Sequence, residues 1–104
     1  MKQHYRERDI EAYLRKQCMA NAILCQKYTS PANNGVPDRF LAGYHHTTHR
    51  PISIFVECKA PGEKPRKLQL SQFRTMRDTY GLIIEIVDTF ERADEVLRTH
   101  FGVN

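Results

Sequence analysis

Two strongly apolar segments of this chain are separated by a stretch with helical periodicity, and this arrangement constrains the fold more than any other feature. Residues 52–59 read Ile-Ser-Ile-Phe-Val-Glu-Cys-Lys, and residues 82–87 read Leu-Ile-Ile-Glu-Ile-Val. Segments that are apolar on both faces are typical of strands inside a sheet. Because a helix between two such strands implies a parallel crossover, the sequence predicts an α/β fold with helices on the faces of the sheet.

The helix between these strands is expected to begin after the loop at residues 60–67, to run to about Tyr80 and to stop at Gly81. One face of this helix carries Gln69, Phe73, Met76 and Tyr80. The stripe that packs on the sheet therefore includes a glutamine, which needs hydrogen-bond partners. A hydrogen bond to a nearby backbone group explains this glutamine as well as a role in a functional site does.

Helical spacing also predicts a first helix over about residues 8–22 and a last helix that ends at Gly102. Asp9 is a possible N-cap of the first helix, and Asp88 followed by Glu91 resembles a capping box before the last one.

The remaining segments predict two further strands, one from about residue 24 and one over residues 38–42, with a polar hairpin loop over residues 43–51. A loop rich in Asn, Pro and Gly spans residues 30–35. The expected order is α-β-β-β-α-β-α, with a central mixed sheet flanked by helices. A chain of 104 residues fits one domain, residues 1–104.

The charge balance and the absence of long apolar runs narrow the class of partner. Sixteen Lys and Arg against twelve Asp and Glu give a net charge of +4, which suits a polyanionic partner without establishing one. The amino terminus has no apolar signal region, and the longest apolar run is far below the ~20 residues of a membrane helix. We therefore expect a cytoplasmic protein with no membrane partner.

Cysteine and histidine usage gives little support for a zinc site or a disulfide framework. The three cysteines form no CxxC pair, and their odd number argues against a disulfide framework, so we expect small core residues. His45, His46 and His49 cluster in the predicted hairpin, where exposed histidines are more common than zinc ligands.

Charged side chains stand at the ends of the otherwise apolar strands. Pro37 favours an extended chain at Asp38, and Glu57 and Lys59 share one face of the segment 52–59 because side chains alternate along a strand. A buried carboxylate is costly unless it is paired or holds a cation. Glu-x-Lys is common by chance, so the second carboxylate, Asp38, is what makes a site plausible. Glu11 could approach from the first helix, or it could be a solvated carboxylate favoured by the helix dipole.

Clustered carboxylates without Cys or His suit a hard cation such as Mg²⁺ or Mn²⁺. Such a cation neutralises phosphate charge and lowers the pKa of a bound water, the two requirements of phosphodiester hydrolysis. Lys59 would orient or deprotonate the water, or stabilise charge on the phosphoryl oxygens.

The ordered set of these motifs resembles the VRR-NUC family of the PD-(D/E)XK nuclease superfamily. The matching segments are residues 9–11, Lys27, residues 30–31, 35–39, 56–62 and 64–69, and a Gly-led last strand. The resemblance implies a restriction-endonuclease-like core and a metal-dependent, structure-selective DNA endonuclease. It implies that the ligands of Mg²⁺ or Mn²⁺ are Glu11, Asp38, Glu57 and the carbonyl of Cys58. Lys59 and Gln69 would complete the catalytic set, with Gln72 as the alternative glutamine.

Small stand-alone members of this family resemble phage enzymes that act on branched DNA such as four-way junctions, and they are similar to homodimeric junction resolvases. We therefore expect branched DNA as the substrate, a homodimer, and, for a phage-encoded enzyme, the cytoplasm of the bacterial host. The expected contacts to the DNA backbone are Lys27, Arg39, Lys64, Arg66 and Lys67, with Arg74 nearby. Three alternatives stay open: a solvated basic loop, a non-catalytic DNA-binding protein on the same fold, and a purely structural α/β protein.

Overall fold

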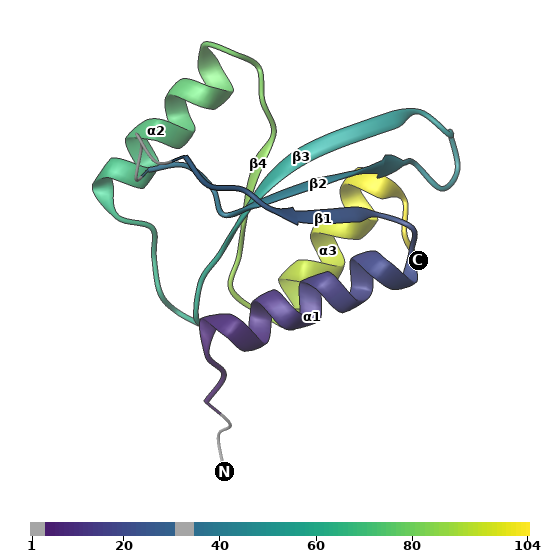
Figure 1. Ribbon diagram of the computed structural model, residues 1–104, viewed down its shortest axis with the longest axis horizontal. Helices are drawn as coiled ribbons and strands as arrows, with labels where there is room; N and C mark the ends of the chain where they lie inside the picture. The colour runs from purple at the N-terminus through teal and green to yellow at the C-terminus, as the bar shows by residue number, and fades with distance from the viewer. Residues whose placement is uncertain (1–3, 31–34) are drawn as a thin grey trace.

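The computed structural model describes residues 4–30 and 35–104 and shows seven elements in the expected order (Figure 1). They are α1 (Glu7–Ala20), β1 (Leu24–Lys27), β2 (Arg39–Tyr44), β3 (Pro51–Cys58), α2 (Lys67–Asp78), β4 (Ile84–Val87) and α3 (Phe90–Phe101). The order α-β-β-β-α-β-α is confirmed. Most of the loop expected over residues 30–35 lies outside the described residues.

The four strands form one mixed sheet in the order β1-β2-β3-β4. β1 pairs with β2 and β2 with β3 in the antiparallel sense, whereas β3 and β4 are parallel. Because α2 connects the two parallel strands, the predicted crossover is confirmed. The sheet is therefore an antiparallel meander extended by one parallel strand.

The two faces of the sheet carry separate apolar clusters. Ile54, Val56 and Cys58 of β3 belong to the larger cluster, which β3 shares with α1 and α3. Phe55 points the other way, toward Phe73 of α2. Figure 1 shows the corresponding layers, with α1 and α3 together and α2 apart from them. The period-two alternation predicted for β3 is thus confirmed, and it sends Glu57 and Lys59 to the face of α2.

Both predicted caps of the outer helices are wrong, although Gly102 is confirmed. The N-cap of α1 is Arg6, and Asp9 is its third residue, whose carboxylate accepts a hydrogen bond from the backbone N–H of Arg6 at 2.8 Å. The N-cap of α3 is Thr89, whose Oγ1 accepts from Arg92 N at 2.9 Å. A carboxylate can serve as an N-cap or reach back to one from the first turn, so residue type alone does not fix the first residue of a helix.

The end of α2 and the position of β4 also differ from expectation. Helix α2 ends at Asp78, so Tyr80 lies beyond it and is exposed rather than on the packed stripe. Leu82 and Ile83 precede β4, and 39% and 42% of their surfaces are exposed. β4 is an edge strand and not an interior one. An apolar sequence indicates that both faces of a strand are covered, but it does not indicate whether another strand pairs with its outer edge.

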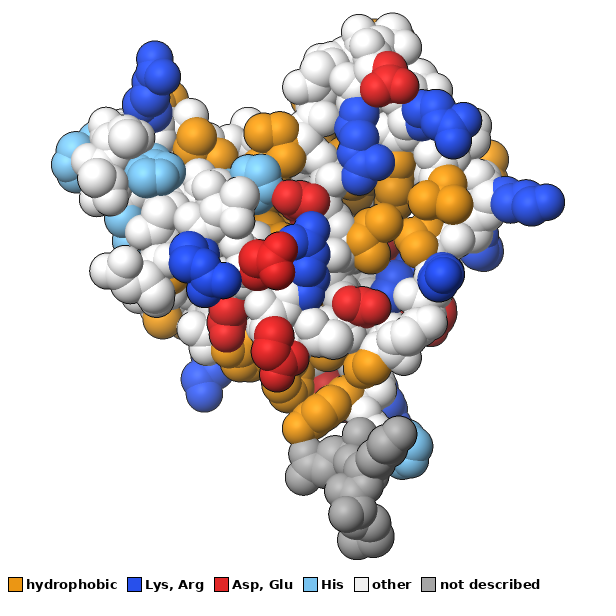
Figure 2. Space-filling model, turned by 180° about the vertical axis from the view of Figure 1, so that it is seen from behind, with side chains coloured by type: hydrophobic (Ala, Val, Ile, Leu, Met, Phe, Trp, Pro, Cys, Tyr) orange, Lys and Arg blue, Asp and Glu red, His pale blue; other side chains and the backbone are white. Residues whose placement is uncertain are grey.

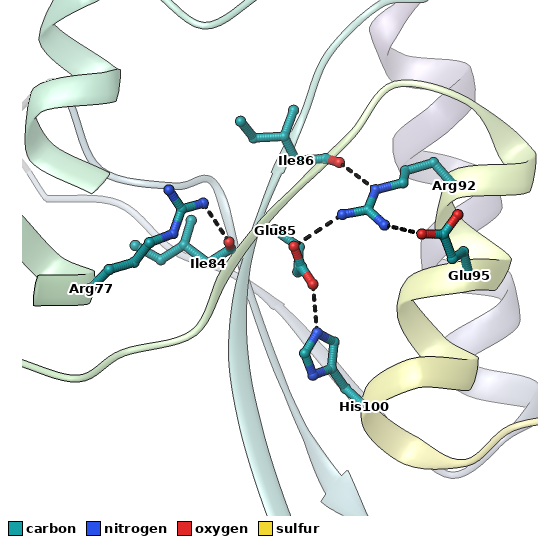
Figure 3. Close-up of polar contacts among 7 residues, drawn as sticks. All are labelled: Arg77, Ile84, Glu85, Ile86, Arg92, Glu95 and His100. Atoms are coloured by element: carbon teal, nitrogen blue, oxygen red, sulfur yellow. Dashed lines mark hydrogen bonds and ion pairs between the residues drawn. The ribbon is translucent and has the colours of Figure 1, made fainter. Parts of the chain in front are cut away.

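Arginine side chains cover the outer edge of β4 (Figure 3). Arg77 of α2 donates from Nη2 to the carbonyl of Ile84 at 2.6 Å, and Arg92 of α3 donates from Nε to the carbonyl of Ile86 at 3.2 Å. Glu85 holds Arg92 in place with an Oε1–Nη2 distance of 3.0 Å. Glu95 and His100 complete the network. Carbonyls that another strand would use are therefore already bonded, which protects the edge from strand addition.

Figure 2 shows the molecule from behind, where acidic and basic side chains are interleaved in the middle of the face. Apolar side chains gather beside them, bordered by Lys and Arg. The positive net charge is therefore not concentrated in one continuous basic surface on this side. None of the helices formed by residues 4–30 and 35–104 has the length and apolar character needed to cross a membrane.

Candidate active site

The two strand carboxylates meet at one end of the sheet. Arg39 of β2 is opposite Val56 of β3, so Asp38, one step before β2, falls opposite Glu57. Directly opposite residues of an antiparallel pair project to the same side. The backbone N–H of Cys58 donates to Asp38 Oδ1 at 3.2 Å, which fixes the Asp38 side chain against the end of β3. This is the juxtaposition that the sequence predicts.

Glu57 is the most constrained carboxylate of the site, with only 5% of its surface exposed. Its Oε2 accepts from Gln69 Nε2 at 2.9 Å and lies 3.2 Å from Lys59 Nζ. Its Oε1 is buried and has no hydrogen-bond partner among the residues that the structure describes. An unpartnered carboxylate oxygen in a protein interior is costly, and a bound cation would remove that cost.

Gln69 and Lys59 are buried beside this carboxylate, with 5% and 7% of their surfaces exposed. The carbonyl oxygen of Gln69 accepts from the backbone N–H of Arg66 at 3.1 Å, while its amide donates to Glu57. The hydrogen bond to a backbone group, one of the two explanations for the helix glutamine, is confirmed, and the other end of the same side chain contacts the Glu57 carboxylate. Gln69, rather than Gln72, contacts the predicted site.

Helix α1 brings two more carboxylates to the same place. Glu7, Glu11 and Asp38 each offer an oxygen, and these oxygens lie within 4.8 Å of one another. Glu11 was expected here from the sequence, but Glu7 was not. Residues four apart on a helix lie on the same face, so the spacing of Glu7 and Glu11 is the signal that could have identified Glu7.

The position of Arg39 argues against the phosphate contact expected for it. Only 9% of its surface is exposed, and its guanidinium contacts Glu11 Oε1 through Nη2 at 2.6 Å and Nε at 3.0 Å. This pair ties α1 to β2. The alternative of a freely solvated Glu11 is wrong, because the carboxylate is held by a buried partner.

The crowding of carboxylates changes their proton affinity. Burial, followed by the nearby charge of Glu57, raises the pKa of Asp38 from 3.8 to about 7, although the hydrogen bond from the backbone of Cys58 lowers it. Burial also raises the pKa of Glu7, against the lowering effect of Lys59. A divalent cation would oppose both rises by stabilising the ionised forms.

The chain around the site carries exposed cations. Lys64, Arg66 and Lys67 lie in and just after the loop between Lys59 and Gln69, and all three are exposed. Lys27, at the end of β1 opposite Arg39, is also exposed. None of these four side chains takes part in an ion pair within the described part of the chain. They are therefore available to contact phosphates.

Two of the three hairpin histidines, His45 and His46, make hydrogen bonds within the fold. His45 Nδ1 accepts from the backbone N–H groups of Thr47 and Thr48, each at 3.1 Å. His46 Nε2 lies 3.0 Å from the carbonyl oxygen of Asn21. Within residues 4–30 and 35–104, the only cluster suited to a metal is the carboxylate group Glu7, Glu11 and Asp38. The donors near the site are all oxygens, which fits Mg²⁺ or Mn²⁺ and not zinc.

Comparisons with known proteins agree with this geometry. No family model matches the chain. Over 67 residues the chain is 42% identical to "Putative nuclease p44" of Acyrthosiphon pisum secondary endosymbiont phage 1, covering 64% of this chain and 67% of that protein. A solved structure described as a VRR_NUC domain has the same fold, with a TM-score of 0.72 and 22% identity over 88% of this chain and 94% of the other. The chain belongs to the same family as this phage protein and has the fold of the VRR_NUC domain.

Proposed function

We propose that this protein is an endonuclease that hydrolyses phosphodiester bonds in DNA with the help of Mg²⁺ or Mn²⁺. The observation that carries the proposal is the unpartnered, buried Oε1 of Glu57. Glu57 is not one of the three clustered carboxylates, Glu7, Glu11 and Asp38, but its charge is near enough to raise the pKa of Asp38. A structural α/β protein has no use for such a group. The name of the phage relative, a nuclease, supports the same activity.

Asp38 and Glu57 would hold the cation, together with the carbonyl of Cys58 and the carboxylates that α1 supplies. Glu11 already shares Oε1 with Arg39, so Glu7 is the freer of the two α1 ligands. When bound, the cation would neutralise phosphate charge and lower the pKa of a coordinated water.

Lys59 and Gln69 would act on either side of the Glu57 carboxylate. Gln69 orients the carboxylate through Oε2 and leaves Oε1 free for the cation. The ammonium group of Lys59, 3.2 Å from Oε2, is held by the same carboxylate. From there it would orient the attacking water and stabilise the charge that develops on the phosphoryl oxygens.

The DNA contacts proposed for Lys27, Lys64, Arg66 and Lys67 follow from their exposure around the site. Such contacts to phosphates position the backbone without reading sequence.

We further propose branched DNA, such as a four-way junction, as the substrate and a homodimer as the active form. A two-fold junction is cut symmetrically by two sites related by a two-fold axis. The phage relative supports a site of action in the cytoplasm of a bacterial host.

Cleavage of a panel of labelled linear, flapped and four-way substrates tests the proposal. The wild type with Mg²⁺ or Mn²⁺ should cut at least one of them, and Lys59→Ala should remove cleavage without unfolding the protein. Lys16→Ala, which removes an exposed lysine from α1, is the matched control and should cut normally. If the wild type binds these substrates but cuts none, a non-catalytic DNA-binding protein is the better account.

A further inference from the structure

Three aromatic rings line the same sheet face as the carboxylates of the proposed site. Phe40 lies two residues after Asp38, and Phe55 lies two residues before Glu57. Tyr28, just past β1, completes the group. The ring centroids of Tyr28 and Phe55 are 5.1 Å apart, and those of Phe40 and Phe55 are 5.3 Å apart.

In the described part of the chain, helix α2 covers this group only at Phe55, which packs against the α2 cluster. Phe73 and Met76 of α2 belong to a cluster with Ile84 of β4, and Phe55 lies at the border of that cluster. Figure 1 shows α2 beside β4, away from the middle of β1 and β2. Tyr28 accordingly keeps 36% of its surface exposed, and Phe40 and Phe55 are only partly buried. An aromatic surface is thus accessible next to the carboxylates.

We propose that Tyr28, Phe40 and Phe55 form a stacking platform for an unpaired nucleobase next to the scissile phosphate. The inference rests on the nuclease function proposed above and specifies its substrate class. Two residues of a strand span roughly 6.6 Å, so the rings lie about one nucleotide from the place where Asp38 and Glu57 would hold the cation that contacts the scissile phosphate. Aromatic rings accept any base, because every base has a π face.

The platform selects against paired DNA for a simple reason. A base inside a duplex is already stacked on both faces and must be extruded before it can contact a ring, which costs unstacking and unpairing free energy. A base on the single-stranded arm of a flap is exempt from most of this cost. The enzyme would therefore select its substrate by the presence of an unpaired nucleotide, without reading its identity.

The test compares Tyr28→Ala, Tyr28→Phe and Tyr44→Ala. Tyr44 is the matched control, because it lies on the same face of β2 at the end far from Asp38 and is 68% exposed. Each variant is assayed with Mn²⁺ on a flapped duplex and on a fully paired duplex. We expect Tyr28→Ala to lower cleavage of the flapped substrate about 5- to 150-fold relative to the paired one, the effect of losing one stacked base. Tyr28→Phe and Tyr44→Ala should keep the wild-type ratio.

A metal-free binding measurement separates this inference from the nuclease proposal. In EDTA, the emission of a fluorescent purine analogue at the unpaired position should be quenched by the wild type and by Tyr28→Phe, but not by Tyr28→Ala. If the wild type cuts no DNA yet quenches the analogue, the nuclease proposal fails and the platform stands. If Tyr28→Ala leaves the ratio of flapped to paired cleavage unchanged, whether or not both rates fall, the platform is refuted. It is also refuted if Tyr28→Ala quenches the analogue as the wild type does. A Tyr28→Ala protein that changes from dimer to monomer in light scattering would assign the face to a second copy of the chain instead.

Discussion

Replacing Asp38 with Asn should stabilise the metal-free protein while removing its response to metal. Burial and the charge of Glu57 raise the pKa of Asp38 from 3.8 to about 7, so the folded protein disfavours the ionised carboxylate. Between pH 3.8 and about pH 7, the Asp38 carboxyl is ionised in the unfolded chain but still protonated in the folded one. Stability therefore falls as the pH rises through this window and levels off above about pH 7. The neutral, isosteric amide of Asn avoids this loss.

The magnitude follows from the same numbers. A rise from 3.8 to about 7 corresponds to about 4 kcal/mol, at about 1.4 kcal/mol for each pH unit. Asp38 is not fully buried, so solvent screening reduces the expected gain to about 2–3 kcal/mol at pH 8. At pH 4 the folded carboxyl is protonated and the unfolded one is only about half ionised, so the gain should be under about 1 kcal/mol.

Urea unfolding in EDTA at pH 4 and pH 8 measures this difference between the wild type and Asp38→Asn. Asp78→Asn, which neutralises an exposed carboxylate at the end of α2, is the control and should change stability by less than about 0.5 kcal/mol. Adding Mn²⁺ should raise the stability of the wild type but not that of Asp38→Asn. An Asp38→Asn protein that is no more stable than the wild type at pH 8 would refute the argument that uncompensated carboxylates crowd this site.

Three further substitutions test other parts of the account. Gln69→Leu should reduce cleavage at least tenfold and stability by about 1–3 kcal/mol, since it removes a buried hydrogen bond to the site carboxylate; Gln72→Leu, the control, should leave cleavage within about twofold. Arg39→Ala should cost about 2–4 kcal/mol in urea unfolding, because it strands Glu11, and a loss below 1 kcal/mol would contradict the structural role of this pair. Arg66→Ala should weaken DNA binding for all sequences alike and reduce the salt dependence by about one phosphate contact, measured by anisotropy across a salt series.

Local sequence pattern predicted most of the fold and the centre of the site. The alternation of Ile54, Val56 and Cys58 with Phe55 and Glu57 fixes the faces of β3, and side-chain period is a local property that survives folding. The order of the elements follows from similar short-range periodicities. The pairing of Asp38 with the end of β3 could also be anticipated, because the two strands are joined by a hairpin whose register aligns them.

Features that depend on long-range contacts could not be predicted from local sequence pattern. From the sequence, Arg39 is predicted to be a free cation next to the motif. Only the packing of α1 on the sheet shows that it forms an ion pair with Glu11, 28 residues earlier. Glu7 joins the site for the same reason. The edge position of β4 depends on no further strand being added, and the arginines that protect it, Arg77 and Arg92, come from two different helices.

The central claim is that Glu57 Oε1 is a ligand position for a divalent cation, and calorimetric titration of Mn²⁺ tests it most directly. The wild type and Lys59→Ala should both bind Mn²⁺, with Lys59→Ala unable to cut DNA, whereas Glu57→Gln should lose Mn²⁺ binding at least tenfold while remaining folded. Undiminished Mn²⁺ binding by a folded Glu57→Gln protein would show that the ion is held elsewhere and would contradict the account.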